Sequence, residues 1–451
     1  MNALANFLSD NEAALWTIAV GALTNASCAM LGCYLVLRRL SLLGDAISHA
    51  ILPGIAVAFL FTGSREVWPM FLGALALGVL TAMLTETLSR FGRVPHDSSM
   101  GVVFSALFAL GVILITRLAR NVDLDPGCVL YGLIDSVSQD TRPVWGVEVP
   151  RVIAPLGLAL VATIVFVTVL WKELKLASFD PGLATAMGFS ATLVHYLLMA
   201  MVSAVTVASF ESVGSILVIA MLIVPPAAAH LLSDRLGWMM AWAVAIGVVS
   251  AAAGYYLAVW ANTSVAGMMA VAAGAQFALA VFCAPRHGII SKAAHQLALG
   301  LRIVREDVVG MLYRVEESRS ARRLGWRDSV RAVGGGLAAY LALPMLVARR
   351  DVALAWDGTL SLTPRGRASA GSLVRSHRLW EAYLNEHFQL PLDHLHEAAE
   401  RVEHYIGPAM QDRLAAELSR PGVDPHGREI PATDGGAKKA AGTAHRGDGR
   451  G

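Results

Sequence analysis

An aspartate and a histidine lie four positions apart in an otherwise apolar stretch, Ser41-Leu-Leu-Gly-Asp45-Ala-Ile-Ser-His49. Residues at i and i+4 share one face of a helix, so a carboxylate oxygen and an imidazole nitrogen can bind the same divalent cation, such as Mn²⁺ or Zn²⁺. Two ligands do not enclose an ion, but two symmetric copies of the chain would supply four. A sparse site also lets an ion leave, which suits transport. The alternative is a structural Asp-His pair that caps the start of the helix.

A denser set of metal-ligand residue types lies near the C-terminus. Two successive predicted helices carry them at helical spacing, with His377 and Glu381 on the first and His396, Glu400, Glu403 and His404 on the second. Neighbouring helices of this kind can bring nitrogen and carboxylate ligands to one or two metal ions. Composition alone favours the alternative, a charged helix face in water.

The elements that must position these residues differ between the two parts of the chain. The first 284 residues hold only 27 charged side chains, whereas the last 167 hold 43. A soluble protein carries about 25% charged residues, so the composition predicts a membrane part followed by a soluble part.

Nine apolar runs are long enough to cross a bilayer, which takes about 20 helical residues. They are residues 13–36, 41–62, 68–88, 99–116, 152–171, 187–208, 212–232, 236–260 and 265–284. Basic residues flank these runs on one side, which predicts that this side is cytoplasmic, with the N-terminus outside. We expect His195, inside the sixth run, to be a packing histidine. Pro225-Pro226 predicts a break or a simple kink in the seventh.

The segment between the fifth and sixth runs has a helix start of its own. Asp180-Pro181 is typical of an N-cap followed by proline at the first helical position, and Gly188 ends the short helix. This helix faces the cytoplasm in the orientation given above. It suits docking to a partner, and the alternative is a mere connector.

Four motifs resemble, in matching order, the permease subunits of zinc and manganese ABC importers. They are residues 41–55, which contain Asp45 and His49, together with residues 130–138, 179–188 and 213–229. The resemblance covers residues 10 to 285. It implies a pore of two permease copies, alike or paralogous, ATPase subunits on separate cytoplasmic chains, and an extracytoplasmic solute-binding protein.

The same resemblance assigns roles to individual residues. Asp45 and His49 match the metal path of the family. The residues that match the coupling helix seated on the ATPase are Asp180, Pro181, Gly182, Leu183 and Gly188. The chain has no GxxxxGK[ST] loop, so we expect it to bind no nucleotide and to be a transport permease rather than an enzyme.

After Arg286 the pattern changes to amphipathic helices. Residues 352–362 alternate and precede Thr363-Pro364, which predicts a two-stranded wing and a turn into a helix. The following residues resemble the metal-binding and dimerisation domain of iron- and manganese-dependent repressors, the diphtheria-toxin-repressor family. The motifs are residues 374–381, 396–405 and 425–431, with 307–317 and 362–367 resembling the ends of that family's winged helix.

This second resemblance implies two metal sites. The residues that match regulatory ligands are Asp307, His377, Glu400, Glu403 and His404, and those that match an ancillary site are Glu381 and His396. Glu400 stands where the iron branch has cysteine, and a hard carboxylate there favours Mn²⁺. Gly310 stands where the manganese branch has a glutamate ligand. Gly334-Gly-Gly336 falls where a DNA-reading helix is expected, and glycine is a poor helix former.

We therefore predict an all-α membrane bundle of about nine spans, followed by a soluble, mainly α unit. The predicted domains are 1–285 permease, 286–370 degenerate winged helix, 371–431 helical metal-binding and dimerisation domain, and 432–451 disordered tail. The predicted function is inner-membrane import of Mn²⁺, with Zn²⁺ or Fe²⁺ as alternatives, under control of a cytoplasmic metal sensor. The competing hypothesis is a membrane-tethered, metal-dependent transcription regulator, although few basic residues are available to bind nucleic acid.

Overall fold

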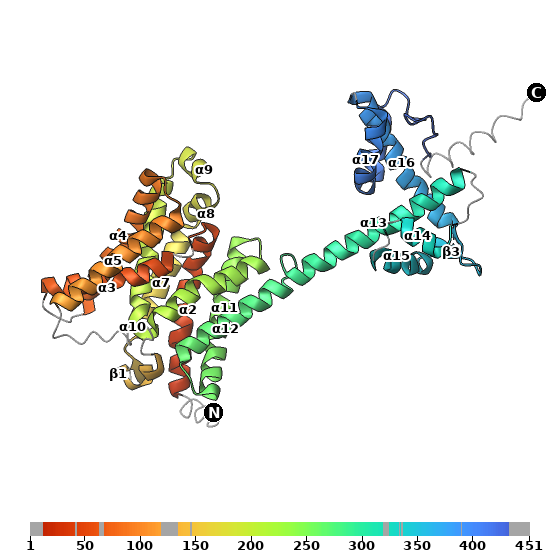
Figure 1. The fold of residues 1–451 in the computed structure, drawn as a ribbon. Helices are drawn as coiled ribbons and strands as arrows, with labels where there is room; N and C mark the ends of the chain where they lie inside the picture. The colour runs from red at the N-terminus through yellow and green to blue at the C-terminus, as the bar shows by residue number, and fades with distance from the viewer. Residues whose placement is uncertain are drawn as a thin grey trace, which may run out of the picture. The chain divides into compact units, whose positions relative to one another are not determined.

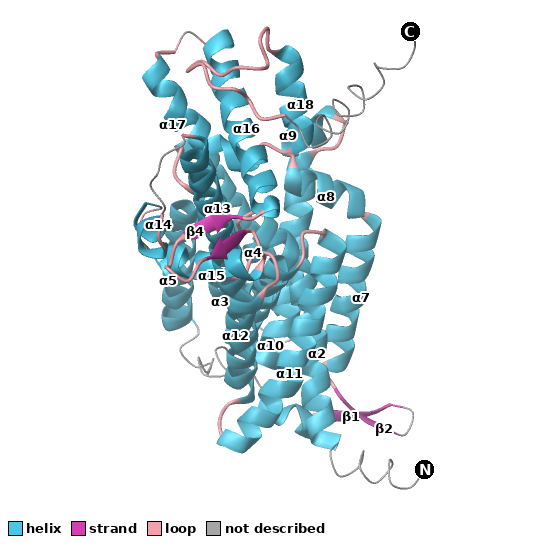
Figure 2. Ribbon diagram, turned by 90° about the vertical axis from the view of Figure 1, so that its right-hand side faces the viewer, coloured by secondary structure: helices cyan, strands magenta, loops and turns pink. Residues whose placement is uncertain are grey.

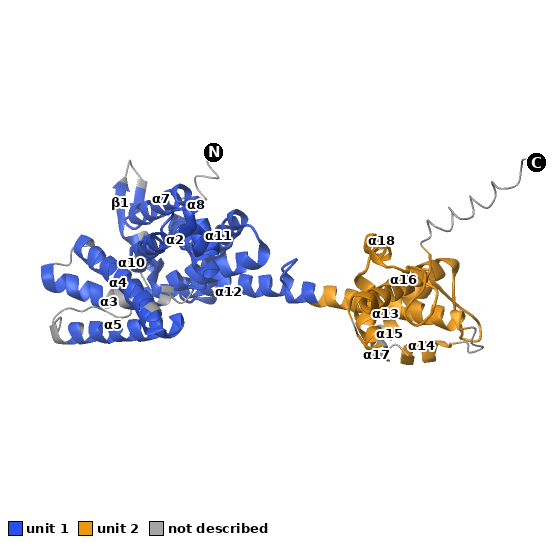
Figure 3. Cartoon of the chain, turned by 90° about the horizontal axis from the view of Figure 1, so that it is seen from above, with its two compact units in different colours: residues 1–292 blue, residues 293–451 orange. Residues whose placement is uncertain are grey.

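The chain is almost entirely helical in the computed structural model (Figure 1). The structure describes residues 12–40, 43–62, 67–118, 134–144, 147–318, 324–332, 334, 337–388 and 390–432. The predicted tail, 432–451, therefore lies almost wholly outside the described residues, and residues 119–133 lie outside them entirely. The chain divides into two compact units, 1–292 and 293–451 (Figure 3).

Unit 1 is a bundle of long apolar helices. Its helices are α2 (Glu12–Leu37), α3 (Leu43–Thr62), α4 (Val67–Gly92), α5 (His96–Leu118), α7 (Ile153–Val169), α8 (Trp171–Phe179), α9 (Pro181–Ala186), α10 (Ala191–Leu232), α11 (Leu236–Ala261) and α12 (Val265–Cys283). A 3₁₀ turn, η1 (Ile134–Gln139), precedes the antiparallel hairpin of β1 (Thr141–Val144) and β2 (Val147–Pro150). Figure 2 shows how little strand the fold contains.

Each of the nine predicted apolar runs lies on one of these helices. Within the described residues, seven helical segments are long and apolar enough to cross a membrane, and an eighth is added if α7 and α8, bent by 73°, form one span. The remaining run is α3, a 20-residue helix that contains Pro53. The predicted bundle of about nine spans is thus broadly confirmed.

The sixth and seventh runs form the two halves of α10. The break between them is at Gly214, whose φ of 76° and ψ of 166° are not helical. The helix continues through Pro225 and Pro226 to Leu232, so the glycine rather than the proline pair interrupts it. A backbone with positive φ favours glycine because it has no Cβ to clash.

Close backbone contacts hold the core of unit 1 together. α10 packs against α2, α4, α11 and α12, and α3 packs against α4 and α5. A Cβ atom on Gly32 of α2 would overlap the carbonyl oxygen of Leu222 on α10, and one on Gly54 of α3 would lie 2.6 Å from the carbonyl oxygen of Gly73 on α4. Small residues at such crossings let helices approach closely in an apolar solvent.

Unit 2 is built on a long amphipathic helix. Its elements are α13 (Ile289–Glu317, whose first four residues belong to unit 1), α14 (Trp326–Ala332), α15 (Leu337–Ala348), β3 (Val352–Leu354), β4 (Leu360–Leu362), α16 (Pro364–His387), α17 (Leu392–Val402), η2 (Glu403–Tyr405) and α18 (Pro408–Glu417). The antiparallel β3–β4 pair confirms the predicted wing. Val308, Leu312, Leu343 and Leu346 form part of one small core, and a second core lies between α16 and α18.

Candidate metal sites

The first candidate pair lies on α3. His49 is half-buried, and its ring stacks on Phe104 of α5 at a centroid distance of 5.5 Å and meets Phe108 edge-on at the same distance. Asp45 lies one helical turn earlier on α3, and its side chain lies outside the described part of the chain. The aromatic rings restrict how the imidazole can turn, which helps to orient its nitrogens.

The predicted short helix after the fifth run is present as α9. Asp180 is its N-cap and accepts a hydrogen bond at 2.9 Å from the backbone N–H of Leu183, while Pro181 takes the first helical position. Gly188 follows with a φ of +88°. Three apolar side chains around α9 are exposed, Phe179 at 60%, Leu183 at 48% and Met187 at 61%.

The first cluster in unit 2 surrounds His404. Its Nε2 lies 3.2 Å from Asp307 Oδ1 and 3.9 Å from Glu403 Oε1, and its Nδ1 lies 2.8 Å from Glu306 Oε2. Ligand atoms of Asp307, Glu403 and His404 all lie within 4.8 Å of one another. Glu306 and Asp307 come from α13, whereas Glu403 and His404 come from η2. The site therefore joins two elements that are almost a hundred residues apart.

This cluster strongly favours positive charge. Burial alone would lower the pKa of His404, but its hydrogen bonds to Asp307 and Glu306 outweigh burial and raise the pKa to about 9. Three carboxylates therefore face one imidazole, with Arg314 3.6 Å from Glu403 on the far side. A donor set of hard carboxylate oxygens and one imidazole fits a divalent cation such as Mn²⁺.

The second cluster centres on His377 of α16, which is only 4% exposed. Its Nε2 lies 3.1 Å from Glu381 Oε1 and 2.9 Å from His396 Nδ1. Its Nδ1 lies 2.5 Å from Glu403 Oε2, so His377 connects the two clusters. Burial would raise the pKa of Glu381, but the hydrogen bond with His377 lowers it to about 2.

Glu381 also belongs to a third set of metal-ligand side chains, with Asp424 and His426, that the sequence analysis did not assign as ligands. Its Oε2 lies 3.8 Å from His426 Nδ1, and Asp424 completes a set of ligand atoms within 4.8 Å. Asp424 already accepts backbone hydrogen bonds from His426 and Arg428, and it lies 3.5 Å from Arg378. His426 is therefore the freer ligand of this pair. The loop that carries His426 has no helical periodicity, and its only signal in the sequence was the string Pro425-His-Gly within the motif 425–431.

Glu400 lies apart from these clusters. It is exposed on α17, and within the described part of the chain it forms no hydrogen bond or ion pair with them. The structure thus brings together Asp307, Glu403 and His404 in one cluster and His377, Glu381 and His396 in another, and the contact between His377 and Glu403 joins the two. Glu306, which the sequence reasoning did not include, joins the first cluster.

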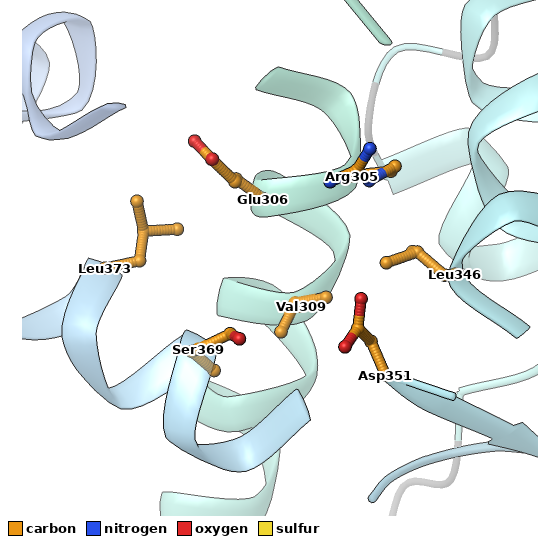
Figure 4. Close-up of a pocket in the computed structure, with 8 residues that line it drawn as sticks. Arg305, Glu306, Val309, Leu346, Asp351, Ser369 and Leu373 are labelled. Carbon is orange, nitrogen blue, oxygen red and sulfur yellow. The ribbon is translucent and has the colours of Figure 1, made fainter. Parts of the chain in front are cut away.

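A small cavity lies beside α13, lined by Arg305, Glu306, Leu346, Asp351 and Leu373 among others (Figure 4). Its volume is about 110 Å³. Pockets for small organic ligands are usually several times larger. The metal-ligand clusters, rather than this cavity, are therefore the candidate sites of unit 2.

The fold and these clusters define a class, a polytopic helical membrane protein with a second unit that carries clusters of metal-ligand side chains. The profile of the ABC 3 transport family matches residues 10–284, and that of the iron dependent repressor, metal binding and dimerisation domain matches residues 363–432. The chain therefore belongs to the ABC 3 transport family, and it carries a repressor-type metal-binding and dimerisation domain at its C-terminal end.

Individual relatives agree with this membership. The manganese transport system membrane protein MntD of Bacillus subtilis is 48% identical over 278 residues, which cover 61% of this chain and 94% of that protein. The zinc transport system membrane protein TroD of Treponema pallidum is 38% identical, over 65% of this chain and 79% of its own length. The structure of PsaBC from Streptococcus pneumoniae in complex with Fab matches with a TM-score of 0.53 and 28% identity, over 63% of this chain and 97% of that one.

Proposed function

We propose that this chain is the membrane permease of an ATP-driven importer of Mn²⁺, with Zn²⁺ and Fe²⁺ as alternative substrates, and that its C-terminal unit senses the imported metal. One observation carries the proposal: a chain of the ABC 3 transport family holds, in the same polypeptide, a built cluster of metal-ligand atoms at Asp307, Glu403 and His404. Similarity to manganese and zinc transport proteins supports the choice of metal.

Asp45 and His49 serve as ligands for the ion in transit. They lie on α3, which packs between α4 and α5, and the His49 ring is held by Phe104 and Phe108. A second copy of the chain, identical or paralogous, supplies the matching pair across the pore. A site of few ligands holds an ion loosely enough for it to move on.

ATP is hydrolysed by a separate cytoplasmic subunit, and a solute-binding protein delivers the ion from outside. Helix α9, capped by Asp180 and Pro181 and closed by Gly188, is the coupling helix that docks on the ATPase. Its exposed apolar neighbours Phe179, Leu183 and Met187 support this role, because such residues at a surface indicate a protein contact. In this orientation the N-terminus is outside and unit 2 is cytoplasmic.

Unit 2 acts as the sensor. Asp307 and Glu306 lie on α13, which begins at Ile289, shortly after the last apolar helix ends at Cys283. Metal bound between α13 and η2 fixes α13 against the rest of unit 2. Because this helix leads to the permease, metal binding can favour one state of the transporter and reduce import when cytosolic metal is high. The second cluster, around Glu381 and His396, is an ancillary site.

A role in transcription is the competing function, and the wing formed by β3 and β4 is the feature that favours it. Helix α15, however, holds no lysine, arginine or histidine, and its Tyr340, Leu341 and Met345 are exposed. A helix that reads DNA needs basic and polar side chains on its exposed face. A gel shift of the purified full chain with DNA upstream of its gene, with and without Mn²⁺, tests this function, and sequence-specific binding would support it.

Metal uptake tests the proposed function directly. We expect cells without other Mn²⁺ importers to accumulate radioactive Mn²⁺ when they produce this chain together with its ATPase and binding protein. Unlabelled Mn²⁺ should compete for uptake better than Zn²⁺ or Fe²⁺. Stronger competition by Zn²⁺ would change the assigned metal, and the absence of any metal-dependent uptake would contradict the proposal.

A further inference from the structure

A polar network joins four helices of unit 1 at one end of the bundle. Arg38, the first residue after α2, donates from Nε to Ser178 Oγ on α8 at 2.9 Å, and its Nη1 lies 3.4 Å from His195 Nδ1 on α10. His195 Nε2 in turn lies 3.9 Å from Glu86 Oε2 on α4. The histidine expected to be a packing residue is therefore the centre of a network of charged groups.

The chemistry of these groups fixes the direction of each bond. A guanidinium only donates, so His195 Nδ1 accepts from Arg38 and the ring proton lies on Nε2, toward Glu86. The Ser178 oxygen accepts from Arg38, while its own hydroxyl donates to the carbonyl of Leu174 at 2.6 Å. The neutral imidazole of His195 therefore lies between the positive guanidinium of Arg38 and the negative carboxylate of Glu86.

The network lies where solvent is largely excluded. The side chain of His195 is 16% exposed and that of Glu86 is 28% exposed. The Nη2 atom of Arg38 is buried and has no hydrogen-bond partner among the described residues. A buried charged group loses much when one of its few partners is removed, because water cannot replace that partner.

One arm of the network reaches the segment that carries α9. Ser178 lies two residues before Asp180, the N-cap of α9, and α8 meets α7 at a bend of 73°. The other arms reach α10 and α4, both of which pack against α3, the helix of Asp45 and His49. Helices α8 and α9 also pack directly on α10, but Arg38 is the side chain whose polar contacts join α8 to α10. A displacement of α9 can therefore reach the helices around the metal path through Arg38.

We propose that Arg38 is a positioning residue that couples α9 to the transport helices, so that ATP hydrolysis on the partner subunit moves metal. The Arg38–Ser178 hydrogen bond carries the movement, and the His195–Glu86 pair holds the guanidinium in place. This inference rests on the proposed function, because it requires α9 to be the site where the ATPase docks.

The sharpest test removes one hydroxyl. The full chain, with its ATPase and binding protein, is reconstituted in lipid vesicles, and both Mn²⁺ uptake and ATP hydrolysis are measured. We expect Ser178→Ala to lower the metal transported per ATP hydrolysed by about tenfold, the factor that corresponds to one hydrogen bond to a charged group. ATP hydrolysis itself should change little, and Ser178→Thr, which keeps the hydroxyl, should restore the ratio.

Thr168→Ala provides the matched control. Thr168 is an exposed residue of the neighbouring helix α7, and among the described residues its hydroxyl bonds only to the carbonyls of Ile164 and Val165 in its own helix. It should leave the ratio unchanged. Arg38→Gln, which also removes the contact with His195, should lower the ratio at least as much as Ser178→Ala. The double variant should be no worse than Arg38→Gln alone, because Ser178→Ala breaks a bond that Arg38→Gln already removes.

Two results would overturn the inference. Either an unchanged ratio in Ser178→Ala, or an equal loss of uptake and ATP hydrolysis that threonine does not rescue, would show that the network only supports the fold. A wild-type transporter that hydrolyses ATP without moving any metal would instead contradict the proposed function. The two failures are therefore distinguishable.

Discussion

Units 1 and 2 hold their helices together in opposite ways. In unit 1 the backbones touch at glycines, and the buried polar side chains are almost all small ones such as Thr24, Asn25 and Ser250. In unit 2 four charged or ionisable side chains of two neighbouring helical elements, His377, Arg378, Glu381 and Glu403, are each less than 5% exposed.

The proposed function accounts for this difference. A charged group in a bilayer costs several kcal/mol, so a membrane path carries few ligands and binds its ion weakly. A unit outside the bilayer can hold many carboxylates, because arginines and histidines compensate their charge. In the function proposed above, unit 1 lets an ion pass and unit 2 holds one, and the following changes test that comparison.

Removing the carboxylate of the proposed metal path should have the largest effect. We expect Asp45→Ala to reduce radioactive Mn²⁺ uptake to the background of cells without the transporter, because the remaining imidazole cannot hold the ion alone. Asp97, exposed in the first turn of α5, is the control. Normal uptake by Asp45→Ala, with Asp97→Ala also normal, would remove Asp45 from the path.

Glycine contacts should be essential only where backbones touch. Gly32→Ala places a methyl group against Leu222 of α10 and should cost about 1–3 kcal/mol or more, as overpacking does. Gly157 of α7 has open space around it, so Gly157→Ala should be neutral. The monodisperse fraction on size-exclusion chromatography in detergent measures both, and equal behaviour would show that the close contact is not needed.

Unit 2 should depend on its buried charges instead. The side chain of Arg378 is 3% exposed, and its Nη1 donates a hydrogen bond to Glu317 Oε1 at 3.0 Å. Its Nε lies 3.5 Å from Oδ2 of the equally buried Asp424. Arg378→Leu leaves Asp424 without its cation and should destabilise unit 2 by about 3–5 kcal/mol. Arg401→Leu, which breaks an exposed pair with Glu397, should cost less than about 1 kcal/mol. Limited proteolysis of the full chain reports both, and similar resistance would contradict the prediction.

Metal binding by unit 2 should distinguish Glu403 from Glu400. Mutating a residue that only orients a metal ligand lowers metal affinity by about 10–100-fold. Glu403→Ala removes a proposed ligand itself, so it should weaken Mn²⁺ binding by at least that factor. Glu400→Ala should change affinity little, because Glu400 is exposed and away from the clusters. Both are measured by Mn²⁺ titration in the Asp45→Ala background. An equal loss in both variants would restore Glu400 as a ligand.

The smallest expected effect is an acid sensitivity of unit 2. The hydrogen bond to Arg378 lowers the pKa of Glu317 below its ordinary value. Its stabilisation is therefore present above the unfolded pKa and lost as pH falls through the lowered folded pKa. Because the carboxylate is 38% exposed, solvent screens much of the effect. Glu317→Gln should reduce the pH dependence of unfolding below about pH 5, and an unchanged slope would contradict this.

Local patterns predicted the elements well because their causes are local. Apolar runs of about 20 residues predicted the helices of unit 1, Asp180-Pro181 predicted the start of α9, and alternation predicted the β3–β4 hairpin. The two resemblances were confirmed by the family profiles.

Sites that depend on tertiary contacts were only partly predictable. Helical spacing assigned Glu400, Glu403 and His404 to one face, but α17 ends at Val402 and the next three residues form a 3₁₀ turn. This turn directs Glu403 and His404 inward and leaves Glu400 exposed. His426 reaches Glu381 from a loop without periodicity, and Arg38, His195 and Glu86 meet only because three separate elements converge.

One measurement tests the central claim, that unit 2 reports internal metal to unit 1. Vesicles that contain the complete transporter are loaded with increasing Mn²⁺ on the side of unit 2, and the initial rate of radioactive Mn²⁺ uptake is recorded. The rate should fall with internal Mn²⁺ for the wild type and stay constant for Glu403→Ala, with equal rates at zero internal metal. Identical curves for the two proteins would contradict the claim.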